Sequence, residues 1–421
     1  MERFVIDGGR RLSGEVKISG AKNSALPIIA ASLLTDREVV LENIPRLNDV
    51  DTMLQLVKSI GSKINFTNNI LHIQTPKLKS FEAPYDIVRK MRASYYVLGP
   101  LIARAGRARV SLPGGCAIGP RPIDLHIKGL KALGVRIEVK AGYINAESRH
   151  LRGNRVDLQG PKGTSVGATI NVMLAATAAK GTTEITSAAC EPEVVDVANF
   201  LNHLGAKISG QGTHTIIIKG QKPLNRGQRY RIIPDRIEAG TFAVAGAITR
   251  GRIRITGCNL EHLTAVLDKF NEIGVVVKVM DDGLLVDGAG RKRATNIFVA
   301  PYPGFPTDMQ AQFMALLSII PGTSTIKETI FENRFMQAVE LMRMGADITI
   351  EGDTAVINGV RKFSGAYVMA SDLRASAALV LAGLAAKGRT VVRRIYHLDR
   401  GYEKFEVKLR RLGARIRRES E

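Results

Sequence analysis

The stretch Leu130-Lys-Ala-Leu-Gly-Val-Arg-Ile-Glu-Val139 joins the end of an amphipathic helix to an alternating strand through one glycine. The same pattern returns at residues 56–64, 201–208, 270–279, 341–350 and 409–416. Six copies at a spacing of roughly 70 residues indicate an internal repeat. We expect each glycine to end its helix in the left-handed conformation, just before the strand begins.

A second element precedes each of these helices. It is an Ala-rich apolar segment that follows one or two polar residues, and its copies begin at Ala21, Met91, Ser165, Ile237, Phe305 and Ser371. Small residues and almost continuous hydrophobicity are typical of a buried helix. Each repeat is therefore predicted to hold a buried helix, a strand, a surface helix and further strands, which makes the chain an α/β protein with helices inside and sheets outside.

Charged and polar residues stand at the starts of these buried helices, where an apolar helix has no structural need for them. They are Lys22, Asn23, Arg92, Ser165, Glu238, Asp308, Asp372 and Arg374. If the repeats point these ends the same way, the groups converge on one cleft that suits phosphate and carboxylate. Asp308, Ser165 and Ser371 could instead be helix caps. Capping does not explain the cations, because they oppose the helix dipole and must have an anionic partner.

The stretch Leu112-Pro-Gly-Gly-Cys-Ala-Ile-Gly-Pro-Arg-Pro122 presents a cysteine and an arginine where glycine and proline exclude regular structure. A helix is expected directly after it, with Asp124 in the first turn. Cys116 is either a small residue in a tight turn or a reactive thiol, and the neighbouring Arg121 favours the thiolate.

Composition limits the class of protein. A length of 421 residues favours two domains, and no apolar run reaches the length of a membrane span, so we expect a cytosolic protein without membrane contact. Three distant cysteines and seven scattered histidines predict neither disulfides nor a metal site, and no cofactor is expected. The formal net charge of +21 suits anionic small substrates, a nucleic acid, or simply a solvated surface.

Several motifs closely resemble the bacterial UDP-N-acetylglucosamine 1-carboxyvinyltransferases, enolpyruvyl transferases of the EPSP synthase superfamily, over essentially the whole chain. They are Gly20-Ala-Lys-Asn-Ser-Ala-Leu-Pro27, Gly114-Gly-Cys-Ala-Ile-Gly-Pro-Arg-Pro122, Pro303-Gly-Phe-Pro-Thr-Asp-Met-Gln-Ala-Gln312, Phe331-Glu-Asn-Arg-Phe335 and His397-Leu-Asp-Arg-Gly-Tyr402.

The resemblance implies an inside-out α/β barrel of six βαβαββ-type repeats, three in each of two domains. It places one domain at residues 21–230 and the other at residues 1–20 and 231–421, with the active site in the cleft between them. It also implies transfer of the enolpyruvyl group of phosphoenolpyruvate to the 3′-hydroxyl of UDP-N-acetylglucosamine, with release of phosphate by addition and elimination. This reaction begins peptidoglycan synthesis, and with it serves cell shape and division.

Residue roles follow from the same resemblance. Cys116 supplies a proton or forms an adduct with phosphoenolpyruvate, and would react with epoxide antibiotics of the fosfomycin type. Asp308 lies against the sugar hydroxyl, and Asp308 or Asp372 handles a proton. The contacts implied for phosphoenolpyruvate are Lys22, Arg121 and Arg400 at the phosphate, with Arg92, Leu373 and Arg374 near the carboxylate. Those implied for the nucleotide sugar are Asn23, Asp308, Arg121, Pro122, Ile123, Asp124, Leu125, Gly163, Thr164, Ser165, Val166, Gly167 and Ile330.

Two other functions remain as alternatives. The sister enzyme acting on shikimate 3-phosphate shares the barrel but lacks the Gly-Gly-Cys loop. A basic repeat protein that binds nucleic acid would explain the charge and leave the cysteine incidental, but the sequence holds no recognition helix and no aromatic residues among its basic clusters.

Overall fold

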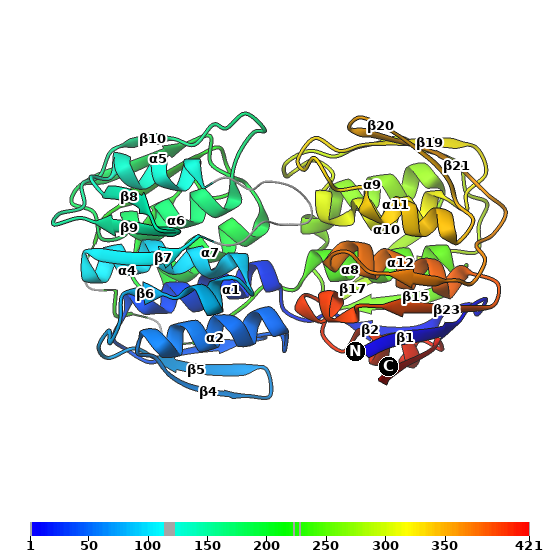
Figure 1. The fold of residues 1–421 in the computed structure, drawn as a ribbon, viewed down its shortest axis with the longest axis horizontal. Coiled ribbons are helices and arrows are strands. Elements are labelled where there is room, and N and C mark those ends of the chain that lie inside the picture. The colour runs from blue at the N-terminus through cyan, green and yellow to red at the C-terminus, as the bar shows by residue number, and fades with distance from the viewer. Residues whose placement is uncertain (1, 113–122, 222–223, 227–228, 421) are drawn as a thin grey trace. The chain divides into compact units, whose positions relative to one another are not determined.

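The computed structural model describes residues 2–112, 123–221, 224–226 and 229–420, and the chain forms two compact units (Figure 1). Within the described residues, unit 1 comprises 2–19 and 234–420, and unit 2 comprises 20–112 and 123–233. The N-terminal segment thus packs with the C-terminal half of the chain.

Each unit holds three four-stranded sheets, and every sheet has one parallel pair followed by two antiparallel pairs. The sheets of unit 2, strand by strand across each sheet, are β14 (Arg229–Arg231), β3 (Val39–Glu42), β5 (Ile70–Gln74) and β4 (Lys63–Thr67); β6 (Glu82–Ala83), β7 (Arg107–Ser111), β9 (Tyr143–Glu147) and β8 (Arg136–Lys140); and β10 (Arg155–Asp157), β11 (Thr182–Thr186), β13 (Thr215–Lys219) and β12 (Lys207–Ser209).

The sheets of unit 1 follow the same plan. They are β2 (Ser13–Lys17), β15 (Arg252–Thr256), β17 (Gly283–Asp287) and β16 (Val276–Met280); β18 (Ile297–Phe298), β19 (Thr323–Lys327), β21 (Thr354–Asn358) and β20 (Asp347–Glu351); and β22 (Tyr367–Met369), β23 (Arg389–Arg393), β1 (Glu2–Asp7) and β24 (Arg415–Ser420). The repeated βαβαββ unit and the mixed α/β class are therefore confirmed. Over the described residues the six sheets are separate, and a continuous barrel is not detected.

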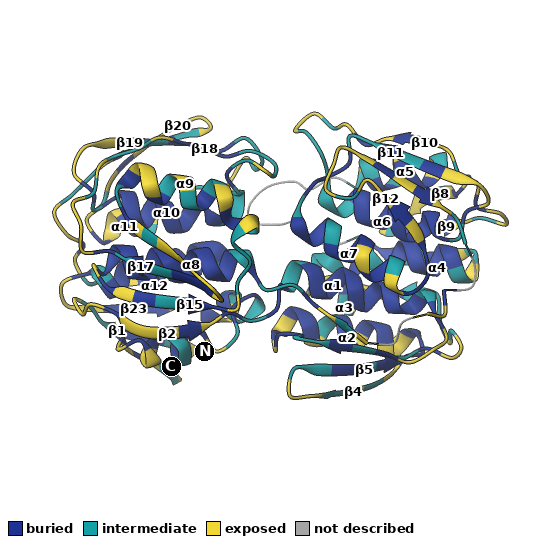
Figure 2. Ribbon diagram, turned by 180° about the vertical axis from the view of Figure 1, so that it is seen from behind, coloured by how far each residue is buried: buried dark blue, intermediate teal, exposed yellow. Residues whose placement is uncertain are grey.

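The first helix of each repeat is buried, as the near-continuous apolar sequence predicts (Figure 2). These helices are α1 (Lys22–Ala31), η2 (Arg92–Val97) continuing into α4 (Leu98–Ala105), α6 (Val166–Ala176), α8 (Arg236–Ile248), η4 (Thr307–Met309) continuing into α10 (Gln310–Leu317), and α12 (Leu373–Ala385). Residues 237–248 of α8 and 374–384 of α12 are buried without interruption. Two copies begin with a 3₁₀ turn, which the sequence did not indicate.

The second helix of each repeat packs one face on its sheet. These helices are α2 (Asn48–Ile60), α5 (Asp124–Ala132), α7 (Pro192–His203), α9 (Thr264–Ile273), α11 (Met336–Arg343) and α13 (Phe405–Arg411). Shorter turns are η1 (Ser32–Leu34), α3 (Tyr85–Val88), η3 (Leu260–Leu263) and η5 (Ile395–Arg400).

All six predicted helix-ending glycines have positive φ, between 86° and 128°. In each copy the N–H of the following residue donates to the carbonyl five residues earlier, as Val135 does to Leu130 at 3.2 Å. This is the Schellman arrangement, and it satisfies carbonyls that would otherwise remain unpaired at the helix end. The predicted role of these glycines is confirmed.

Candidate functional site

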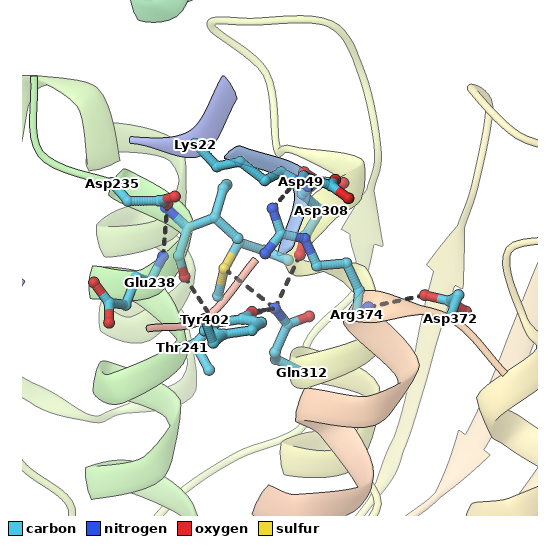
Figure 3. A network of polar contacts seen from close by, with 12 residues as sticks. Lys22, Asp49, Asp235, Glu238, Thr241, Asp308, Gln312, Asp372, Arg374 and Tyr402 are labelled. Carbon is cyan, nitrogen blue, oxygen red and sulfur yellow. Dashed lines mark hydrogen bonds and ion pairs between the residues drawn. The ribbon is translucent and has the colours of Figure 1, made fainter. Parts of the chain in front are cut away.

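A buried polar cluster lies at the starts of α8, α10 and α12 in unit 1 (Figure 3). Both oxygens of the Asp308 carboxylate accept hydrogen bonds from guanidinium groups, Oδ1 from Arg334 at 2.7 Å and Oδ2 from Arg374 at 2.8 Å. The arginine side chains are only 5% and 4% exposed, against 27% for Asp308. Charge-assisted bonds of this length are among the stronger polar contacts in proteins, so the carboxylate is held in one orientation.

Arg374 keeps hydrogen-bonding capacity beyond this ion pair. Burial acts to lower the pKa of Arg374, but the charge of Asp308, together with Tyr402, Asp235 and the hydrogen bond to Asp308, more than offsets it, so the pKa lies above its usual value and the side chain is a permanent cation. Its Nε and NH1 atoms are buried and have no hydrogen-bond partner among the described residues. A guanidinium with donors to spare can bind a second anion.

A network of hydrogen bonds among uncharged side chains supports the Asp308 cluster. The Gln312 amide Nε2 donates to the backbone oxygen of Asp308 at 2.9 Å and reaches the hydroxyls of Thr241 and Tyr402 at 3.1 and 3.2 Å. The two hydroxyls lie 2.9 Å apart. The Arg374 guanidinium stands 5.4 Å from the centroid of the Tyr402 ring. Because Gln312 and Thr241 are fully buried, these contacts fix the backbone that carries Asp308.

Asp372 caps a helix. Its Oδ1 accepts from the backbone N–H groups of Arg374 at 2.8 Å and Ala375 at 3.1 Å, which fixes the start of α12. Ser371, considered above as a cap, only reaches the Asp372 carboxylate, at 3.4 Å. The catalytic role expected for Asp372 stays a prediction. At Leu373, the side chain lies against Gly401, where an added Cβ would stand 2.6 Å from a Leu373 methyl.

Arg400 ends η5, which packs against α12. Burial, followed by the charge of Arg400, lowers the pKa of His397, whereas the charge of Asp372 raises it. Arg400 and Asp372 therefore both lie within electrostatic reach of one imidazole. The structure thus brings Asp308, Asp372, Leu373, Arg374 and Arg400 into one region of unit 1.

Glu238, which the sequence also places at a buried helix start in unit 1, belongs to a structural ion pair. Lys408 Nζ donates to its Oε1 at 2.6 Å, and the backbone N–H of Ser19 donates to its Oε2 at 2.7 Å. Burial raises the pKa of Glu238, and the charge of Lys408 counteracts this. The helix itself is capped by Asp235, which accepts from Ile237 N–H at 2.8 Å.

Ile330 lies on a turn that the carboxylate of Glu328 joins to η4 by hydrogen bonds. Glu328 Oε1 accepts from the N–H groups of Ile330 at 2.8 Å and Phe331 at 3.2 Å, and Oε2 accepts from Thr307 Oγ1 at 2.8 Å. Burial raises the pKa of Glu328. Since Thr307 directly precedes Asp308, this carboxylate holds the Ile330 turn next to the Asp308 cluster.

In unit 2, the cation at the start of α1 has the anionic partner that its position requires. Lys22 Nζ lies 3.3 Å from Asp49 Oδ2, and both side chains are largely buried. Asn23 follows on the same helix and is half-buried. Arg92 begins η2, which packs against α1, and its guanidinium is 5.4 Å from the Tyr95 ring centroid.

The residues expected around the nucleotide sugar come from α5 and the turn before α6. Ser165 caps α6, since its Oγ accepts from Ala168 N–H at 3.3 Å. For Ser165 the predicted alternative role of a helix cap is therefore correct. Gly163 has φ of +89° and pairs through its backbone with Gly160, against which Leu125 packs. Ile123 and Asp124 precede Leu125 at the start of α5, Thr164 lies in the turn before α6, and Val166 and Gly167 are the first two residues of α6.

His126 joins these segments, although nothing in the sequence singled it out. Its Nδ1 lies 3.0 Å from Asn171 Nδ2, which also donates to the Tyr95 carbonyl at 2.9 Å. An added Cβ at Gly167 would stand 3.0 Å from the His126 ring. Because Asn171 Nδ2 is a donor, Nδ1 must accept, and the ring proton is on Nε2.

His126 predicts a measurable dependence of stability on pH. Burial, followed by the charge of Arg92, lowers its pKa from 6.5 to about 4. Between these values the unfolded chain binds a proton that the folded chain does not, so this contribution is complete above pH 6.5 and is lost as pH falls towards 4. The loss is on the order of 3 kcal/mol. Urea unfolding at pH 7.5 and pH 4 measures it.

His126→Gln is the matched control, because the amide oxygen of glutamine can accept from Asn171 without titrating. The wild type should lose more free energy of unfolding over this pH range than the variant does. Equal losses in the two proteins would contradict a buried neutral imidazole.

Cys116, Arg121 and Pro122 lie outside the described residues. Within the described ranges, no group of three or more histidine, cysteine, aspartate or glutamate side chains could hold a metal ion. Over the same ranges, no helix combines the length and apolar character needed to cross a membrane.

Comparisons with known proteins cover nearly the whole chain. Residues 6–409 match the family model for EPSP synthase (3-phosphoshikimate 1-carboxyvinyltransferase). The chain is 55% identical to UDP-N-acetylglucosamine 1-carboxyvinyltransferase 2 of Carboxydothermus hydrogenoformans, with 100% of both chains covered. It is 54% identical to UDP-N-acetylglucosamine 1-carboxyvinyltransferase of Thermodesulfovibrio yellowstonii, covering 99% of this chain and 100% of the relative.

Solved structures agree with these relatives. The enolpyruvyl transferase NikO from Streptomyces tendae matches with a TM-score of 0.90 at 28% identity, over 99% of this chain and 98% of that one. EPSP synthase from Acinetobacter baumannii matches over 100% of both chains with a TM-score of 0.78. Its identity of 18% shows a shared fold alone.

Proposed function

Because this chain belongs to the EPSP synthase family of enolpyruvyl transferases, we propose that it transfers the enolpyruvyl group of phosphoenolpyruvate to the 3′-hydroxyl of UDP-N-acetylglucosamine. The names of relatives more than half identical over full length support the nucleotide sugar as acceptor, rather than shikimate 3-phosphate. The observation that carries the proposal is the Asp308 carboxylate held between two buried guanidiniums, each of which keeps at least one donor without a hydrogen-bond partner among the described residues.

The chemistry has two steps. In the addition, the sugar oxygen bonds to C2 of phosphoenolpyruvate, a proton is delivered to C3, and the hydroxyl loses its proton. In the elimination, the bond from C2 to the phosphate oxygen breaks and C3 gives up a proton, which restores the double bond and releases phosphate. Each step needs a positioned acid or base, and the anionic substrate needs fixed cations.

Most of the described residues proposed for the reacting end of these substrates belong to unit 1. The free Nε and NH1 donors of Arg374 would bind the carboxylate of phosphoenolpyruvate. Asp308, already oriented by both arginines, would accept from the sugar hydroxyl. Lys22 and Arg400, with Arg121, would bind the phosphate, and Cys116 would supply the proton to C3 or hold an adduct. Asp372 would orient the start of α12 and take part in proton transfer.

Most of the residues proposed for the nucleotide sugar belong to unit 2. Backbone N–H groups at the start of α6, over residues 163–167, would bind the diphosphate, as helix N-termini do for phosphates generally. Ile123, Asp124 and Leu125 would line the uridine, with Arg121 and Pro122 before them. Asn23 would reach the glucosamine, Ile330 would contact the nucleotide sugar, and Arg92 would remain near the phosphoenolpyruvate carboxylate.

The proposal also covers the cellular setting. We place the enzyme in the cytoplasm, at the start of peptidoglycan synthesis, with the two substrates as its partners and a thiol-alkylating epoxide of the fosfomycin type as an inhibitor at Cys116. We further propose that the two compact units correspond to the two three-repeat domains and that both act on the same pair of substrates.

The proposed reaction predicts that purified protein releases phosphate from phosphoenolpyruvate only when UDP-N-acetylglucosamine is present. Cys116→Ala should lower that rate by about 10²-fold or more if the thiol transfers a proton. Cys116→Asp should stay active in the presence of the epoxide, whereas the wild type is inactivated. A colorimetric phosphate assay measures all three results.

Shikimate 3-phosphate is the control acceptor. Release that requires shikimate 3-phosphate instead of the nucleotide sugar would replace the proposed acceptor with the sister reaction. No release with either acceptor, together with a salt-sensitive shift of RNA or DNA on a gel, would favour nucleic-acid binding.

A further inference from the structure

A cavity lies in unit 1, far from the Asp308 cluster. Its volume is about 600 Å³, which is within the usual range for small-molecule sites. It is formed where α8, α9 and α10 end, together with the loop that follows β17. The Asp308 cluster lies at the starts of α8 and α10, whereas the cavity lies where these helices end. The 13 residues of α8 place the two ends of that helix about 20 Å apart.

The floor of the cavity is apolar. Ile273, Leu316 and Ile320 lie directly beneath it and are at most 1% exposed, and the half-buried Ile319 and the exposed Pro321 give the apolar surface that a ligand can touch. An aliphatic surface of this kind stabilises an apolar ligand by removing it from water, at roughly 25 cal/mol for each Å² buried. The floor therefore calls for a ligand with a hydrocarbon body.

The rim of the cavity is cationic. Arg250, Arg291, Lys292 and Arg293 line it, and none of its described lining residues is acidic. Two of the four cations have a structural role, because Lys292 Nζ donates to the Gly288 carbonyl and Arg293 Nε donates to the Glu272 carbonyl near the end of α9. Cations near a helix C-terminus are favourable in their own right.

Arg250 and Arg291 differ from this pair. Within the described part of the chain, neither side chain donates a hydrogen bond or forms an ion pair, although both line the same cavity. Burial, followed by the charge of Arg250, lowers the pKa of Lys292, and Asp287 offsets this only in part. The rim thus carries positive charge that the surrounding protein does not neutralise.

We propose that this cavity binds an organic anion with an apolar body, whose carboxylate or phosphate pairs with Arg250 and Arg291 while its hydrocarbon part covers the isoleucine floor. A small inorganic anion would leave the floor uncovered, and a neutral amphiphile would leave the two guanidiniums unpaired. The site is separate from the proposed active site, so its ligand need not be a substrate.

Decanoate serves as the probe, with decanol and inorganic phosphate as matched ligands that lack the charge or the chain. Titration calorimetry should give one decanoate site per chain, and δ1-methyl NMR should show shifts at Ile273, Ile319 and Ile320. Decanol and phosphate should each bind about tenfold more weakly or worse, because each makes half of the contacts.

The variant Arg250→Gln/Arg291→Gln should weaken decanoate binding by about tenfold or more. Arg252→Gln/Arg361→Gln removes the same net charge from two exposed arginines that do not line the cavity, and should bind decanoate as the wild type does. Both variants should keep the wild-type rate of phosphate release, which shows that they fold. Equal affinity in the two double variants, methyl shifts elsewhere, or phosphate binding as tightly as decanoate would overturn the proposal.

Discussion

Asp308→Asn is expected to lower kcat by about 10³-fold, because the substitution removes both the proposed acceptor for the sugar proton and the anion that orients Arg374. Asparagine has nearly the same shape, but its amide nitrogen cannot accept from a guanidinium. One of the two bonds, at 2.7 and 2.8 Å, must therefore be lost, and a donor is placed against a donor. Phosphate release under saturating substrates measures kcat.

The same substitution should also destabilise the fold. Breaking a buried ion pair costs about 3–5 kcal/mol, but Asp308 is 27% exposed, so we expect a loss below that range. Urea unfolding separates this effect from the effect on kcat. The matched control is Asp372→Asn, since asparagine caps a helix as well as aspartate does and its loss of stability should be small. If Asp308→Asn retains kcat within threefold of the wild type, the proposed role of Asp308 is wrong.

The coupling between Asp308 and Arg374 provides a further check on this prediction. If the two side chains act as one unit, Asp308→Asn should cost far less in an Arg374→Met background than in the wild type. Additive effects on kcat would mean that the two residues serve the reaction independently.

Gly359→Ala is expected to cost more than about 4 kcal/mol of unfolding free energy or to prevent folding altogether. An alanine Cβ at this position would stand 1.6 Å from the backbone oxygen of Ile320. The backbone fixes the position of the Cβ, and the oxygen belongs to the main chain, so no change of side-chain rotamer relieves the overlap. Chemical denaturation measures the loss, and the yield of folded protein gives a second reading.

Gly352→Ala is the control for this prediction. Gly352 has a positive φ of +60°, unlike Gly359, but an added Cβ there meets no atom within 4 Å. The substitution Gly352→Ala should lower the free energy of unfolding by only roughly 1–2 kcal/mol, which is the cost of holding an alanine in the left-handed conformation. If Gly359→Ala were no worse than Gly352→Ala, the close approach of the two segments would be incorrect.

The repeat explains how much of the fold could be predicted from the sequence. Helix-ending glycines and apolar helices are local signals, so six copies of each identified a repeat of buried helix, strand, surface helix and further strands without any structure. Gly359 and its counterpart Gly220, whose added Cβ would stand 1.6 Å from the Ala179 carbonyl, gave no such signal. Their role depends on contact with a residue about 40 positions away, and a single sequence does not reveal that contact.

The candidate site shows the same limit. Asp308 and Arg374 could be named because a charge at the start of an apolar helix lacks a structural reason. Arg334 and His126 could not, because an arginine or a histidine in a polar stretch looks like any exposed residue until burial is known. The requirement that Lys22 have an anionic partner was correct, but only the structure identifies Asp49.

The place of β1 determines when each unit can be completed during synthesis on the ribosome. Unit 2 has all its strands once β14 emerges, because β14 pairs with β3. β1, in contrast, pairs with β23 and β24, which are made last. At about 5–20 residues per second, the first strand waits roughly 10–40 s after residue 233 for its partners. Unit 2 can therefore fold while the chain is still growing, whereas β1 stays available to chaperones until β23 and β24 have emerged.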